Sequence, residues 1–141
     1  MRKLLLILLA LSGCTAPEDS LHEDFFSLRG GTFPVTVDVL ITPDVEMAAQ
    51  YVRDNLDTTV QPCDFDGAAG LTFDFQDGKA AIIWLEKATL DPEDIAIINH
   101  ELLHATMNTM RYSGVSLSDS SEEAYAYQLQ YYSNQFYNKI K

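Results

Sequence analysis

Basic residues are scarce in this chain. Its 141 residues include 9 lysines and arginines against 21 aspartates and glutamates, which gives a formal net charge of −12 at pH 7. A protein that binds nucleic acid needs a basic surface, so this balance argues against nucleic acid as a partner. It argues equally against attachment to anionic lipid by charge alone.

Hydrophobic runs long enough to cross a membrane are also lacking. The apolar run from Leu4 to Leu11 follows the basic pair Arg2-Lys3, whereas a membrane-spanning helix needs about 20 apolar residues. This arrangement is typical of a secretory signal. The sequence Leu-Ser-Gly-Cys at residues 11–14 then resembles the lipobox of bacterial lipoproteins.

That resemblance implies a signal peptide over residues 1–13 and a lipid on Cys14. The protein would then lie in the cell envelope, anchored to a bacterial membrane on its periplasmic or extracellular side. Several acyl chains on one residue anchor stably, where a single chain binds only marginally. The alternative is an ordinary signal peptide with a chance cysteine.

Cysteine is as rare as long apolar runs. The chain has 2 cysteines, and lipidation of Cys14 leaves only Cys63, so no internal disulfide can form. We expect Cys63 to be a small packed residue rather than a metal ligand or a reactive thiol.

The remainder divides into a tether and one domain. Residues 14–31 are polar and contain Pro17 and the pair Gly30-Gly31, so we interpret them as the lipidated cysteine and its tether. Residues 32–141 are enough for a single domain, and a hydrophobic content of 47% supports a packed core.

Periodicity predicts an α+β fold for that domain. Alternating apolar residues indicate strands, and apolar residues at helical spacing indicate helices. We expect an antiparallel-rich sheet with its helices on one face. The predicted elements are strands at residues 33–42, 71–75 and 79–87, a hairpin turn at 77–78, and helices at about 45–56, 92–112 and 121–138.

The helix from Pro92 to Tyr112 is the best marked. Asp91 suits the N-cap, proline suits the first helical position, and Gly114 suits the stop. The middle of this helix reads His-Glu-Leu-Leu-His at residues 100–104.

The histidine pair in this segment predicts a metal site. Positions i and i+4 share one face of a helix, so His100 and His104 can direct two imidazole nitrogens at one zinc ion. Glu101 would then reach the edge of the site and accept a proton from the bound water, which is the chemistry of H-E-x-x-H. The alternative is a histidine pair that is solvated or satisfied within the core, and the uncharged residues around the pair argue against it.

The third ligand has to come from elsewhere. The only other histidine is His22, and no histidine lies six residues beyond His104. A carboxylate remains, and the segment Ser-Ser-Glu-Glu-Ala-Tyr-Ala-Tyr at residues 120–127 supplies Glu122 and Glu123.

Here the chain resembles the gluzincins, zinc peptidases whose third ligand is a glutamate on the next helix. The spacing of Glu123 to Ala126 and Tyr127 fits their pattern, and residues 91–132 look like small metallopeptidase-like proteins of phages and bacteria. The resemblance implies a minimal zincin-like fold in which Glu123 binds zinc. Larger gluzincins often carry Asp or Asn where Tyr127 stands.

Alternatives remain for both Glu122 and Glu123. Ser120 with Glu123, or Asp119 with Glu122, has the spacing of a capping box. If Asp119 and Glu122 cap, Glu123 is free for zinc. Tyr127, one turn after Glu123, could stabilise the oxyanion on a substrate carbonyl.

The sequence therefore predicts a membrane-anchored zinc peptidase that hydrolyses peptide bonds in a peptide or protein substrate. We expect residues 79–87 to be the edge strand along which substrate binds. The alternative is a surface lipoprotein, with zinc or without metal, that acts by binding a partner and has no hydrolytic activity.

Overall fold

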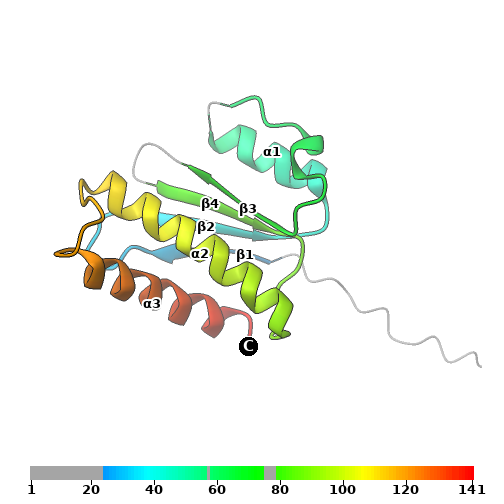
Figure 1. Ribbon diagram of the computed structural model, residues 1–141. Helices are drawn as coiled ribbons and strands as arrows, with labels where there is room; N and C mark the ends of the chain where they lie inside the picture. Colours follow the sequence, from blue (N-terminus) through cyan, green and yellow to red (C-terminus); the bar gives the residue numbers. More distant parts are fainter. Residues whose placement is uncertain (1–23, 57, 75–78) are drawn as a thin grey trace, which may run out of the picture.

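The computed structural model of the protein describes residues 24–56, 58–74 and 79–141, and Figure 1 shows how its elements are arranged. The predicted turn at 77–78 lies outside the described residues. The elements are β1 (Asp24–Arg29), β2 (Thr36–Ile41), α1 (Val45–Asn55), a short 3-10 helix (Pro62–Phe65), β3 (Gly70–Asp74), β4 (Lys79–Leu85), α2 (Pro92–Tyr112) and α3 (Glu122–Lys139).

The four strands form one mixed sheet in the order β1-β2-β4-β3. β1 pairs with β2 and β3 with β4 in antiparallel fashion, whereas β2 and β4 are parallel. The prediction that residues 79–87 form an edge strand is wrong, because β4 lies between β2 and β3. Six of the seven β4 residues are buried, since a strand with neighbours on both sides and helices on both faces has no side open to water.

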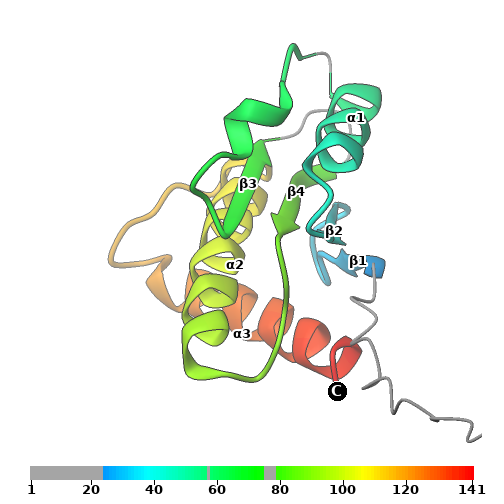
Figure 2. The ribbon, with the colours of Figure 1, turned by 90° about the vertical axis from the view of Figure 1, so that its right-hand side faces the viewer.

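Helices cover both faces of this sheet. Val37 and Val39 face a core formed with α2 and α3, whereas Leu40, Ile82 and Trp84 face a second core formed with α1. Figures 1 and 2 show α1 on the side of the sheet away from α2 and α3. The prediction that the helices lie on one face is wrong. The physical reason is that the inner strands carry apolar side chains on both faces.

The first strand occupies part of the expected tether. β1 pairs with β2 from Asp24 to Arg29, its Leu28 is fully buried, and the ring of Phe26 lies 5.6 Å from that of Phe136 on α3. Residues 24–31 therefore belong to the folded domain, because their apolar side chains complete its core. Residues 14–23, including Cys14, lie outside the described residues.

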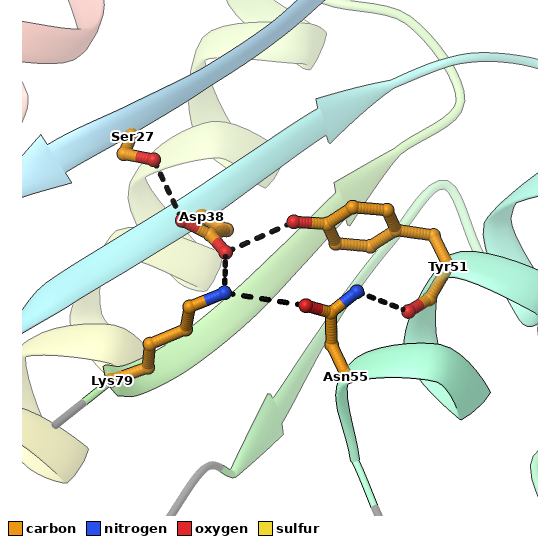
Figure 3. Close-up of polar contacts among 5 residues, drawn as sticks. All are labelled: Ser27, Asp38, Tyr51, Asn55 and Lys79. Atoms are coloured by element: carbon orange, nitrogen blue, oxygen red, sulfur yellow. Dashed lines mark hydrogen bonds and ion pairs between the residues drawn. The ribbon is translucent and has the colours of Figure 1, made fainter. Parts of the chain in front are cut away.

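A buried carboxylate fixes the sheet face beneath α1. Asp38 on β2 accepts hydrogen bonds from Ser27 (2.7 Å) and Tyr51 (3.0 Å) and forms an ion pair with Lys79 (2.7 Å). Lys79 also reaches Asn55 on α1, as Figure 3 shows. Burial raises the pKa of the Tyr51 phenol, and the Asp38 carboxylate raises it further. These partners compensate the buried negative charge of Asp38. Because Tyr51 and Asn55 belong to α1, the cluster also fixes the position of α1 on the sheet.

The short 3-10 helix after α1 differs from the sequence prediction at Cys63. In the 3-10 helix Phe65 is buried and packs on Trp84, with ring centroids 4.9 Å apart. Cys63 is exposed and carries a free thiol. The prediction that Cys63 is packed is wrong, because Phe65 and not Cys63 is the residue of this short helix that faces the core. Within the described part of the chain, no helix has the length and apolarity that crossing a bilayer requires.

Candidate metal centre

The histidine pair lies on the open side of α2. The helix runs from Pro92 to Tyr112, as predicted. Ile98, Leu102 and Ala105 recur at the spacing of one helical face and are buried against the sheet. His100 and His104 lie on a different face and are exposed. The same residues that bury the helix therefore leave both imidazoles accessible.

The two imidazoles face each other at hydrogen-bonding distance. His100 Nε2 and His104 Nε2 lie 3.1 Å apart, and the ring planes meet at 79°. Two nitrogens bound tetrahedrally at about 2.05 Å from zinc lie about 3.3 Å apart. The pair therefore fits two positions of a zinc coordination sphere without a change of helix geometry.

A residue of the sheet binds the carboxylate of Glu101, which follows His100 in the sequence. Glu101 is 6% exposed, and Thr72 Oγ1 on β3 donates a 2.6 Å hydrogen bond to its Oε2. A glycine permits this approach, because a Cβ on Gly70 would lie 3.0 Å from Glu101 Cγ and 2.9 Å from Ile97 Cγ2. β3 and α2 therefore approach closely enough for a strand residue to orient the carboxylate.

Cavities lie on both sides of the histidine pair. One of about 420 Å³ is bordered by His100 and Glu101 together with Gly70 of β3. The other, of about 560 Å³, is lined by Asp74, His104, Met107, Asn108, Arg111, Gly114, Val115, Ser116, Leu117 and Tyr125. Both volumes fall in the range of small-molecule sites. A ligand that contacts the histidines can thus extend in either direction along α2.

The polar end of the larger cavity is electrically balanced. Arg111 Nη2 lies 2.8 Å from Asp74 Oδ2 and also donates to Asn108 Oδ1. Asn108 in turn donates to Asp74. The cation is paired with an acid of β3, so this end of the cavity carries no excess charge.

Of the two α3 residues predicted for the site, Tyr127 lies at a different cavity from the histidines. Glu123 and Tyr127 are exposed and one turn apart, so they share a face of the helix. Tyr127 lines a separate cavity next to Gly31. Among the residues that the structure describes, no group of three or more His, Cys, Asp or Glu side chains is gathered closely enough to hold a metal ion. The structure therefore brings the two histidine nitrogens together and places His100 and Glu101 at one cavity, whereas Tyr127 borders a cavity that neither histidine lines.

Neither predicted capping box forms at the start of α3. The helix begins after Ser121, whose side chain makes no capping bond to the helix. Ser121 Oγ instead donates to the carbonyl of Ser116 and accepts from the amide of Ser118. Glu122 and Glu123 are therefore not held by the cap.

Three residues near the site were not predicted: Gly70, Thr72 and Tyr125. Tyr125 is half-buried, donates from its hydroxyl to the carbonyl of Val115 (2.8 Å), and lines the cavity beside His104. The available signal in the sequence was helical spacing, because Tyr125, Leu129, Tyr132 and Phe136 recur on one face of the last helix. The roles of Gly70 and Thr72 depend on the contact between β3 and α2, for which the sequence holds no local signal.

Comparisons of the chain with protein-family models, curated proteins and solved structures find no match. The resemblance to gluzincins therefore stays a prediction. The structure establishes an α+β fold with a four-stranded mixed sheet and three α-helices among the described residues.

Proposed function

We propose that the protein is a zinc-dependent peptidase anchored to a bacterial membrane through lipid on Cys14. The observation that carries the proposal is the 3.1 Å separation of the two imidazole Nε2 atoms on the exposed side of α2. A minimal zincin-like fold belongs to the same proposal. It is supported by the position of the histidine helix against an edge strand, β3, of the mixed sheet.

The residues of the site divide the chemistry among themselves. Bound zinc would polarise a substrate carbonyl and lower the pKa of a coordinated water to about 7. Glu101 accepts the proton of the attacking water and later returns it to the leaving amine. Thr72 keeps Oε2 of that carboxylate hydrogen-bonded, so the other oxygen, Oε1, is left to face the water.

The third ligand is proposed to be a carboxylate at the start of α3. The gluzincin resemblance selects Glu123, and Tyr127 with it as an oxyanion donor, but Tyr127 lines a cavity that neither histidine borders. The geometry of α3 favours Glu122, because Tyr125, three residues on, lines the cavity beside His104. Either carboxylate requires the start of α3 to approach α2 when metal binds.

Zinc content tests the metal site. The full-length protein, purified in detergent without added metal, should contain about one zinc per chain, as structural and catalytic zinc sites do. His100→Ala and His104→Ala should each abolish the bound zinc. The third histidine supplies a matched control, since His22→Ala should leave the zinc content unchanged. No zinc in the wild type, even after zinc is added, would contradict the proposal.

Peptide hydrolysis separates the peptidase from its rival. The wild type should cleave members of a peptide library, and chelation should stop the cleavage. Zinc at one equivalent with no cleavage by any preparation would instead assign the chain to the alternative, a zinc-binding lipoprotein that acts by binding a partner.

A further inference from the structure

A third cavity of the molecule lies away from the histidines. It has a volume of about 480 Å³ and is walled by α3 and by the turn after β1, which Figure 1 shows beside the start of α3. We call it the α3 cavity, and its lining residues are Gly31, Thr32, Phe33, Ala124, Tyr127, Gln128, Gln130, Tyr131 and Asn134. Its size is that of a small-molecule site.

Exposed aromatic rings form one wall of the α3 cavity. Tyr127 and Tyr131 are one turn apart on α3 and are 66% and 42% exposed. The turn packs directly on one of these rings, because a Cβ on Gly31 would lie 3.1 Å from Tyr131 Cε1. Gly31 also has a φ of +70°, which favours glycine. The position of Tyr131 is thus fixed by the fold, whereas its neighbour Tyr127 offers its ring to solvent.

The remaining lining is polar but carries no charge. Gln128, Gln130 and Asn134 each contribute an amide, which both donates and accepts hydrogen bonds. None of the residues that line the α3 cavity is an acid or a base. A charged ligand would lose its hydration there without finding an opposite charge.

One amide of this wall is not satisfied within the described part of the protein. Gln128 is 6% exposed, and its Nε2 is buried without a hydrogen-bond partner. A buried donor in this state is costly to stability. The side chain of Gln128 lies near the buried phenol of Tyr132, where its amide tends to lower the pKa of that phenol against the larger effect of burial.

We propose that the α3 cavity binds an uncharged saccharide that carries N-acetyl groups. The apolar C–H face of a sugar ring packs on tyrosine rings, and its hydroxyls pair with amide side chains. An acetamido group presents one donor and one acceptor, which matches the amides of Gln128 and Asn134. The proposal does not depend on the metal centre, whose histidines line other cavities.

The surroundings disfavour an extended peptide as the occupant. Peptides that bind by strand addition need an open strand edge, and the α3 cavity is walled by a helix and a turn. A strongly acidic ligand is disfavoured by the net charge of −12.

The test is a titration of the full-length protein with the N-acetylglucosamine trimer. Calorimetry measures the binding, and the detergent has no sugar headgroup, so that it does not compete with the trimer. We expect saturable binding, and we expect Tyr127→Ala to weaken it about tenfold, the loss of one ring contact. Tyr127→Phe keeps the ring and should bind within about twofold of the wild type.

Two further arms make the result decisive. Tyr112→Ala removes an exposed tyrosine of α2 that does not line the α3 cavity, and it should bind the trimer as the wild type does. The glucosamine trimer, which lacks the acetyl groups and carries charge, should not bind. Absence of binding by the acetylated trimer would overturn the proposal. So would binding that Tyr127→Ala leaves unchanged, or preferential binding of uncharged peptides in its place.

Discussion

Thr72 on the edge strand β3 donates a 2.6 Å hydrogen bond to Oε2 of Glu101 on α2. Its hydroxyl also lies 3.2 Å from the main-chain carbonyl of Glu101. A residue of the sheet thus fixes the carboxylate that we propose as the general base. The strand and the helix meet at the proposed reaction centre, so its geometry depends on their packing.

Replacement of Thr72 by valine should impair hydrolysis while zinc binding persists. A hydrogen bond to a charged group contributes about 1.5–3 kcal/mol, and its loss should lower kcat about tenfold or more. Thr72→Ser keeps the hydroxyl and should retain most of the activity. Steady-state kinetics with one peptide substrate give the measurement, and equal kcat values for the valine variant and the wild type would contradict the role assigned to Thr72.

Glu101→Gln should abolish hydrolysis without releasing zinc. The amide is nearly isosteric but cannot accept the proton of the attacking water, and loss of a general base typically costs about 10²–10⁴-fold in rate. Glu93→Gln, an exposed carboxylate of the same helix, is the matched control. Activity that survives in Glu101→Gln would remove this carboxylate from the mechanism.

The two candidate third ligands at the start of α3, Glu122 and Glu123, lead to opposite predictions for zinc binding. If Glu122 completes the site, Glu122→Gln should weaken zinc binding by about 10-fold or more, whereas Glu123→Gln should have little effect. The reverse result would support the ligand that the gluzincin resemblance selects. Competition with a chromogenic chelator measures both variants in parallel, and unchanged affinity in both would exclude either residue as a ligand.

Gly70→Ala should disturb the site by steric crowding. The added Cβ would approach Ile97 Cγ2 to 2.9 Å and Leu85 Cδ2 to 3.0 Å, and overpacking of this kind costs about 1–3 kcal/mol. We expect a lower melting temperature in thermal denaturation and a reduced kcat. A variant as stable and as active as the wild type would show that β3 and α2 can separate freely.

The buried carboxyl of Asp94 should make the free energy of unfolding of the domain depend on pH in the acidic range. It is 3% exposed in the first turn of α2, accepts a hydrogen bond from Thr89 and pairs with Lys87 at 3.1 Å. Burial tends to raise the pKa of this carboxyl, but the contacts with Thr89 and Lys87 outweigh it and hold the pKa below its ordinary value.

The sign of the effect follows from that lowered pKa. A carboxyl with a lower pKa in the folded state stabilises fully above its unfolded pKa of about 3.9, and the stabilisation is lost as the pH falls through the folded-state pKa. Asp94→Asn should therefore cost about 1–3 kcal/mol near neutral pH and progressively less below about pH 4. Thermal denaturation of both proteins across that range provides the measurement, and a difference independent of pH would contradict it.

Local signals predicted the helix that carries the two histidines correctly because they act within one turn. Pro92 at the first helical position and Gly114 after the last turn mark boundaries that match those of α2. The i and i+4 spacing of His100 and His104 likewise requires nothing beyond the helix itself. The 3.1 Å nitrogen separation is a consequence of that spacing.

Features that depend on distant parts of the chain were missed. The strand order places β4 inside the sheet, although its continuous apolar run was a signal of burial on both faces. β1 was mistaken for tether because polar residues surround its few apolar ones, Phe25, Phe26 and Leu28, and because its pairing with β2 cannot be read from its own sequence. Thr72 and Glu101 lie 29 residues apart, so no periodicity joins them.

The single-sided pairing of β3 gives the domain two separate levels of stability. β3 is bonded to β4 alone, whereas β4 and β2 are each paired on both sides. Opening of β3 from the sheet edge would break fewer contacts than unfolding of either core, and such local events precede global unfolding. Thr72 would leave Glu101 in this event while both helical layers stay folded. Hydrogen exchange at β3 amides should therefore be faster than at β2, and the proposed catalytic arrangement should be lost and regained many times within the lifetime of one folded molecule.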